Sequence, residues 1–288
     1  MNIDIDTCST CGEDVSKYYL NPFCPRCLHP IGPPNVREVS RDDEKDALEE
    51  RYEVAFEMSQ EDGSYSNLMD LDAAMHKTCA VINVDLGFLY AFITNDKALY
   101  STYTLQVRGN VRIPAEPKDD RHRMGIEGML FGSYGEKIRY AALSLDGRGV
   151  VSYGPYAMQL SDVAIAERAT LLEENSYDFV ETYAMRPGDP IPPGYRSTWQ
   201  DRHKLAVAKL AERVSETTPP DAHPALLLSS EGNYEGDDFI EVHIYGPFNP
   251  RAIAAVHGRS RTKNAVEGAQ LRVIKDILTR AGKEWMEV

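Results

Sequence analysis

The sequence predicts an α+β fold preceded by a small cysteine-rich module. Three observations lead to this prediction. Four of the five cysteines form two C-x-x-C pairs near the start of the chain, segments with strand-like alternation gather in its middle, and helical spacing is confined to separate blocks. Strands and helices kept in blocks are typical of an α+β domain, because a parallel α/β sheet needs regular alternation of the two.

Composition and charge place the chain among folded, globular proteins. Charged residues make up 26% and apolar residues 42% of its 288 residues. A net charge of −14 repels phosphate backbones, so nucleic-acid binding would need a local basic patch, such as 121–123 or 251–263, and both are more simply solvated surface. The chain contains no run of 18 apolar residues and begins with acidic residues, so we expect no membrane partner and a cytoplasmic location.

The cysteine spacing predicts one structural zinc ion. Two C-x-x-C knuckles supply four thiolates, which is the tetrahedral donor set that Zn²⁺ prefers; they are Cys8, Cys11, Cys24 and Cys27. Two disulfides are the alternative, which a reducing cytoplasm disfavours. Four sulfur ligands close the site, so it should hold shape without doing chemistry. Cys79 opens an apolar stretch and is predicted to be a buried strand residue, with no activating base near it in sequence.

The remaining elements follow in order along the chain. Three prolines and a glycine at 29–35 predict a linker, so we place a zinc ribbon and linker at 1–35 and one main domain at 36–288. That domain should open with a pair of helices at 42–59 and 68–76. Strands are predicted at 81–94, 99–107, 138–145, 156–160, 225–229 and 239–245, with a hairpin turn at 146–149, and helices at 199–216, 252–256 and 263–280.

One predicted strand carries groups suited to chemistry. In 239–245, Ile240, Val242 and Ile244 alternate with polar residues. If the apolar face lies in the core, Glu241, His243 and Tyr245 share the other face, which should be wet or line a cleft. A carboxylate, an imidazole and a phenol there could serve acid-base work or stabilise an oxocarbenium ion, although a solvated sheet face gives the same pattern. The glycine-rich run 128–135 lets backbone approach a ligand but lacks phosphate-loop spacing.

The order of the motifs resembles a known family. From Leu99 to Pro250, about half the chain, the sequence resembles the domain of unknown function 3626 family, a bacterial group similar to the ADP-ribosyltransferase superfamily. The matching segments are 99–103 with 108–110, Arg123, Glu127 and 130–134, 139–143, 168–170 with 175–176, and 239–247. The sequence departs from the family at His243, where the family has Gln, at Ser133, where it has Gly, and in a shortened motif at Arg139 and Tyr140. These changes leave acceptor specificity more open than the use of NAD.

The resemblance implies an ADP-ribosyltransferase-like split β-sheet domain that cleaves NAD and transfers ADP-ribose to a macromolecule. It implies Glu241 as the carboxylate that faces the oxocarbenium ion, and His243 as a group that orients or deprotonates the acceptor. An arginine suits the pyrophosphate and aromatic faces suit the cationic nicotinamide. The expected NAD-binding residues are Arg139, Tyr140, Arg108, Tyr134, Tyr153, Thr170 and Ser176.

Three functions remain open at this stage. The first is a mono-ADP-ribosyltransferase, in the manner of a toxin or phage-defence effector that an antitoxin partner restrains, with the zinc module choosing the target. The second is a glycohydrolase that passes ADP-ribose to water. The third is a zinc-ribbon protein that only binds a nucleotide or a partner. The acidic charge favours a protein acceptor, and a zinc ribbon favours nucleic acid.

Overall fold

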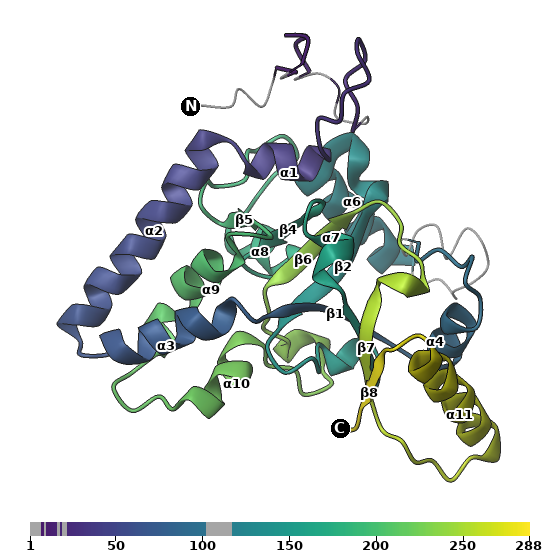
Figure 1. The fold of residues 1–288 in the computed structure, drawn as a ribbon. Coiled ribbons are helices and arrows are strands. Elements are labelled where there is room, and N and C mark those ends of the chain that lie inside the picture. Colours follow the sequence, from purple (N-terminus) through teal and green to yellow (C-terminus); the bar gives the residue numbers. More distant parts are fainter. Residues whose placement is uncertain (1–6, 9, 16–17, 19–21, 102–116) are drawn as a thin grey trace.

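The protein is described from a computed structural model that covers residues 7–8, 10–15, 18, 22–101 and 117–288 (Figure 1). Of 117–123 and of residue 235 it describes the backbone alone. Arg108 and most of the strand predicted at 99–107 lie outside these residues. Within them, Tyr100 forms an isolated antiparallel bridge with Phe248.

The centre of the molecule is an eight-stranded sheet with the order β5-β4-β6-β2-β1-β3-β7-β8. Neighbouring strands are antiparallel, with the exception of β7 and β8, which run parallel. The strands are β1 Cys79–Val84, β2 Ile138–Ser144, β3 Tyr156–Leu160, β4 Ala169–Leu172, β5 Arg196–Thr198, β6 Glu241–Tyr245, β7 Ile253–His257 and β8 Glu284–Met286. Helices and antiparallel strands in one domain confirm the α+β class.

Helices cover one face of the sheet in two groups, with α2, α3 and α9 together and α4 beside α11 (Figure 1). Their bounds are α2 Asp42–Glu61, α3 Tyr65–Met75, α9 Arg202–Leu210, α4 Leu86–Ile93 and α11 Ala265–Arg280. Ile240, Val242 and Ile244 are fully buried in the core beneath them. The apolar half of the alternation in β6 therefore faces the core, as the sequence predicts. No helix in the described part of the chain is long and apolar enough to cross a membrane.

A second layer of helices covers the opposite face of β4, β6 and β2. It consists of α6 Pro117–Phe131, the 3₁₀ helix η1 Gly132–Lys137 and α8 Ser176–Thr182. Their apolar side chains, among them Phe131 and Phe179, pack on Ile138 and Tyr245. This face was expected to be wet or to line a cleft. It is not wet, because a second apolar layer packs on it, and the cleft stays a prediction.

The segment predicted as one long strand at 81–94 divides in two. Strand β1 ends at Val84, and α4 begins at Leu86. The carboxylate of Asp85 accepts a hydrogen bond from the backbone N–H of Phe88 at 2.7 Å, which caps the first turn of the helix. Residues 86–93 are apolar apart from Gly87 and Tyr90, so their pattern has no period that separates helix from strand.

The hairpin predicted around 146–149 is also wrong. Strands β2 and β3 do not pair with each other, because β1 lies between them and is antiparallel to both. The loop is nonetheless a tight turn, in which Gly147 and Gly149 have φ of +78° and +64°. The prediction of a turn is therefore correct, and the prediction that the two flanking strands pair is wrong. The strand between them, β1, comes from an earlier part of the chain.

In two short segments of the C-terminal part, the secondary structure is the opposite of the prediction. Residues 225–229 belong largely to α10 His223–Leu227, which has a proline in its first turn. Residues 252–256 were predicted as a helix and instead form most of β7, which pairs with β3. β7 contains Ile253 and Val256, whose branched side chains suit a strand. Both segments are too short for their periodicity to decide.

Helix α1 Pro34–Val39 begins inside the predicted linker and crosses the boundary that we predicted between the linker and the main domain, at residues 35 and 36. Asn35 in this helix is 2% exposed. Its Nδ2 donates to the carbonyl of Arg168 at 3.2 Å, to Thr170 Oγ1 at 3.2 Å and to the carbonyl of His243 at 3.3 Å. One side chain from the predicted linker therefore joins two central strands.

We expect Asn35→Ala to lower the free energy of unfolding by about 1 to 3 kcal/mol, because it removes the three hydrogen bonds that this buried amide donates. Urea denaturation measures the change. Asn67→Ala is the matched control, because Asn67 donates one exposed hydrogen bond to the carbonyl of Ser215. Equal, small losses in both variants would show that α1 does not help to hold β4 and β6.

Candidate functional site

Most of the predicted site residues fall into two groups. The first group is the cysteine module. Each C-x-x-C pair occupies a tight turn closed by backbone hydrogen bonds, from Gly12 N to the carbonyl of Cys8 at 2.9 Å and from Leu28 N to the carbonyl of Cys24 at 2.9 Å. The two turns follow the same path, since Gly12 and Leu28 stand four residues after the first cysteine and have φ of +70° and +59°. Leucine disfavours this conformation, so the fold of the second turn is imposed on it.

The four cysteines come together as a metal-ligand set. All four sulfurs lie within 4.8 Å of one another, and both Cys8–Cys27 and Cys11–Cys24 are separated by 3.6 Å. The edge of a tetrahedron with four Zn–S bonds of about 2.3 Å is about 3.8 Å, whereas a disulfide bond is about 2.0 Å long. The cysteines are free thiols, so the alternative of two disulfides is not what the structure shows. The spacing fits a tetrahedral metal ion.

The module touches the main body through α1. Arg37 donates from Nη1 to the carbonyl of Val15 at 3.1 Å and from Nη2 to the carbonyl of Tyr18 at 2.8 Å. The module has little core of its own, with Cys8, Val15 and Cys24 as its buried apolar residues among those described. So small a core cannot fix the shape of the module alone, so its contacts with α1 contribute, and a metal bound by the four sulfurs would add to them.

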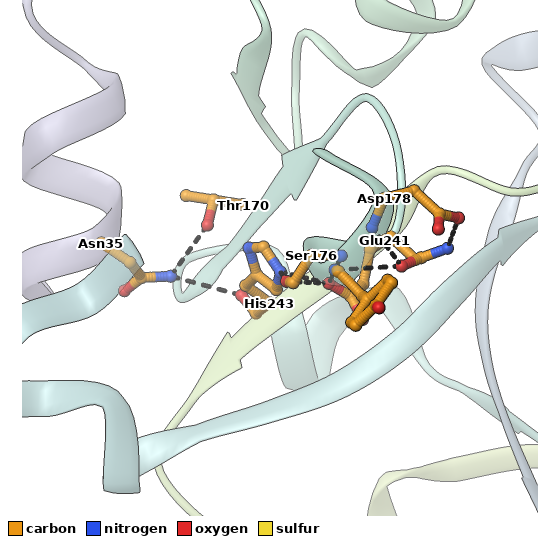
Figure 2. A network of polar contacts seen from close by, with 8 residues as sticks. Asn35, Thr170, Ser176, Asp178, Glu241 and His243 are labelled. Carbon is orange, nitrogen blue, oxygen red and sulfur yellow. Dashed lines mark hydrogen bonds and ion pairs between the residues drawn. The ribbon is translucent and has the colours of Figure 1, made fainter. Parts of the chain in front are cut away.

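The second group centres on Glu241, the first residue of β6 (Figure 2). The residue is 9% exposed, and three donors converge on Oε2 of its carboxylate. The backbone N–H of Ser176 donates at 2.9 Å, the Ser176 hydroxyl donates as well, and His243 Nε2 lies at 2.9 Å. Among the described residues every hydrogen bond to this carboxylate ends on Oε2, which leaves Oε1 able to accept from a ligand.

The sequence places Ser176 against the carboxylate by starting a helix there. Asn175 caps α8, and its side chain accepts from the N–H groups of Tyr177 and Asp178, each at 3.0 Å. The N–H of Ser176 belongs to the first turn, where helical N–H groups lack a partner within the helix. Glu241 supplies that partner, so the capping of α8 and the orientation of the carboxylate are one arrangement.

Three predicted residues form a row across neighbouring strands. Thr170 in β4 and Tyr140 in β2 are the register partners of His243 in β6, and directly opposed residues share a face of the sheet. The Tyr140 and Phe131 rings lie edge-on to the imidazole of His243, at 5.5 Å and 4.8 Å between centroids. His243 is 2% exposed, so it is enclosed rather than presented to an acceptor.

Tyr134 lies close to this row without entering it. Its ring is 5.8 Å from that of Phe131, and its hydroxyl donates to Glu38 Oε2 at 2.6 Å. Burial and the Glu38 charge raise the pKa of Tyr134, so the phenol stays protonated. The structure therefore gathers Glu241, His243, Thr170, Tyr140 and Ser176, with Tyr134 beside them.

Arg139 is predicted to share a cleft with Glu241, but its position in the sheet does not fit that prediction. It is the register partner of Ile244, so it lies on the opposite face of the sheet from Tyr140. Its guanidinium donates to the carbonyls of Lys137 at 2.6 Å and Tyr100 at 3.3 Å. Burial, together with the nearby charge of Arg168, lowers the pKa of Arg139 to about 10. A ligand seated against Glu241 from its own face does not meet this arginine.

Tyr153, the last of the predicted aromatic residues, belongs to another part of the surface. It is 44% exposed in the 3₁₀ helix η2 Val151–Tyr153, and its ring lies 5.2 Å from that of Tyr234. Close by is a cavity of about 480 Å³, lined among others by Asn83, Arg148, Ala157 and His257. This cavity adjoins β1, β3 and β7, not the Glu241 end of β6.

Sequence reasoning missed two contributors to the Glu241 site. Phe131 encloses His243, and Asn35 donates to Thr170 and to the carbonyl of His243. Phe131 lies within the glycine-rich run 128–135, where the sequence already indicates that the backbone could approach a ligand. For Asn35 no signal existed, because a prolyl linker gives no indication of a buried amide.

The comparisons with known proteins leave the geometry as the main evidence. No model of a known protein family matches this chain, and no curated protein matches it. The motif resemblance between Leu99 and Pro250 therefore stays an expectation, and any function is argued from the residues that the fold brings together.

Proposed function

We propose that the protein is a mono-ADP-ribosyltransferase that uses NAD and acts through Glu241. The observation that supports this proposal is the environment of the carboxylate. Two donors from Ser176 and one from His243 hold Oε2 in place, which leaves Oε1 for the ribose of a substrate. A fixed carboxylate whose second oxygen is free is what an oxocarbenium-like transition state requires.

The proposed reaction breaks the C–N bond between ribose and nicotinamide, and nicotinamide leaves with the bonding electron pair. Glu241 opposes the positive charge that develops on the ribose, and an acceptor oxygen, nitrogen or sulfur then forms the new bond to the anomeric carbon and loses its proton. His243 acts here as a positioning residue, because it is buried against Phe131 and Tyr140 and its Nε2 holds Glu241. The nicotinamide ring is expected against an aromatic face such as Tyr140.

The partners in this proposal are NAD, a macromolecular acceptor and, if the protein is a toxin or phage-defence effector, an antitoxin. The metal in the module is proposed to be one Zn²⁺, bound by the four thiolates at tetrahedral spacing. The proposed location is the cytoplasm, because a reducing compartment keeps the cysteines available as thiolate ligands. In this scheme the module selects the acceptor and the sheet carries the chemistry.

The test uses the full chain loaded with zinc and NAD labelled in the adenylate. We expect free nicotinamide to accumulate and the label to become attached to a protein or a nucleic acid in a cell extract. Nicotinamide release with label only on free ADP-ribose would make the protein a glycohydrolase. If no nicotinamide is released, the enzymatic proposal falls, and the domain binds a nucleotide or a partner without cleaving NAD.

A further inference from the structure

A second set of metal-ligating side chains lies far from the cysteines, between α3 and α9. Asp72, His76 and His203 each offer one ligand atom, and these atoms all lie within 4.8 Å of one another. Asp72 belongs to α3, and His76 follows the end of the same helix four residues later. A separation of four residues places two side chains on one helix face, one above the other.

The backbone around the two histidines is held firmly by one arginine. Arg202, the neighbour of His203 in α9, donates from Nη2 to the carbonyl of His76 at 2.6 Å. The same guanidinium donates to Thr78 Oγ1 at 3.1 Å and to the carbonyl of Trp199 at 2.9 Å. Because Arg202 is buried and bonded to both segments, its guanidinium ties the end of α3 to the start of α9.

The side chains in the cluster have unmet bonding capacity. Asp72 Oδ1 and His203 Nδ1 are shielded from solvent and have no hydrogen-bond partner among the described residues. The rings of His76 and His203 stack at 4.0 Å, with 28° between their planes. The ring of Tyr52 closes one side, at 6.0 Å from that of His203. Buried polar atoms without partners cost folding free energy, and a bound cation would remove that cost.

The surrounding charges do not oppose a cation. Lys204, beside His203, is the nearest positive side chain on α9 after Arg202, and it forms an ion pair with Glu49. Asp201 accepts from the Thr198 hydroxyl at 2.8 Å and adds a negative charge on the same helix end. The carboxylates of Asp72 and Asp201 both act on His203, and the ammonium of Lys204 is paired with Glu49.

We propose that Asp72, His76 and His203 bind a divalent first-row transition metal, of the Zn²⁺ or Co²⁺ type. Two imidazoles and one carboxylate are a donor set for these ions, whereas Mg²⁺ and Ca²⁺ prefer oxygen ligands alone. Ligand atoms about 2.1 Å from one ion are at most about 4.2 Å apart, so a small rotation of the exposed His76 completes the site. Three protein ligands leave at least one coordination position for water or a ligand, unlike the closed cysteine site.

The experiment fills the cysteine site with Zn²⁺, removes excess metal, and then titrates the full chain with Co²⁺ while recording visible absorption. We expect one further equivalent to bind with the d–d bands of cobalt and without a thiolate-to-cobalt charge-transfer band. His203→Ala and Asp72→Asn should each weaken this binding by more than about 100-fold, because even residues that only orient metal ligands are worth about 10- to 100-fold. Mg²⁺ at the same concentration should not compete.

Asp70→Asn is the matched control, since Asp70 is exposed on α3 and outside the cluster, and it should bind Co²⁺ like the parent. Circular dichroism of each variant shows whether α3 and α9 still form. The proposal is overturned if the parent takes up no further equivalent, or if the folded variants keep its affinity. A charge-transfer band would mean exchange at the cysteines instead, and would count against it too.

Discussion

Glu241→Gln is expected to slow NAD cleavage by about 100- to 1,000-fold while NAD still binds. Glutamine keeps the shape of the side chain and can still accept at one oxygen, but it carries no charge to oppose the oxocarbenium ion. One electrostatic group of this kind is worth about 3 to 4 kcal/mol in the transition state. Initial rates of nicotinamide release, together with NAD binding by calorimetry, separate the two effects.

The same variant should also change stability, because the carboxylate is buried. Its hydrogen bonds to Ser176 and His243 become weaker when the acceptor is neutral, so we expect the free energy of unfolding to fall by about 1 to 3 kcal/mol. Glu181→Gln is the control, since Glu181 is exposed on the same helix as Ser176. A Glu241→Gln protein that is folded and turns over NAD at the parent rate would remove Glu241 from the reaction.

Removing the zinc ion that we propose for the cysteine module should unfold the module and leave the sheet intact. Structural zinc contributes about 10 to 16 kcal/mol to such small folds, far more than a core of a few buried residues can supply. Cys24→Ser, or a strong chelator, should therefore make the cysteine module sensitive to protease. Metal analysis and amide hydrogen exchange follow the two parts separately.

Cys79→Ala provides the comparison for this experiment. Cys79 is buried in β1, where its thiol donates to the carbonyl of Ser144 at 3.4 Å, and it has no place in the metal set. This variant should keep its zinc and its protected module. Should Cys24→Ser retain a protease-resistant module and a full complement of metal, the four cysteines would not be the ligands of a structural ion.

The sequence could predict those parts of the fold whose pattern had a clear period. The alternation in β6 and the helical spacing in α9 identify both the element and its buried side, and α11 was predicted as a helix. The segments 86–93 and 252–256 could not be predicted, because the first is almost wholly apolar and the second is only five residues long. Pairing was beyond reach as well, since the insertion of β1 between β2 and β3 depends on contacts between distant segments.

The candidate sites, like the fold, could be predicted only in part. Cysteine spacing was sufficient to predict that the four sulfurs lie together as a set that could hold a metal ion, because each C-x-x-C pair is local. For the Glu241 site, the strand pattern correctly placed Glu241 and His243 on one face, but nothing in it shows that Phe131 and Asn35 would close over that face. Arg139 and Tyr140 are adjacent in sequence, and that adjacency in a strand is why only one of them can face His243.

Helix α1 gives the molecule a mechanical link between its two sites. Asn35 is bonded to the backbone of β6 at His243, and two residues later Arg37 is bonded to the module at Val15 and Tyr18. Side chains two apart point to different sides of a helix, so α1 works as a short spacer between the metal module and the strand that carries Glu241. Thermodynamic linkage then runs in both directions: any factor by which zinc changes the affinity for a ligand at Glu241 is the factor by which that ligand changes the affinity for zinc.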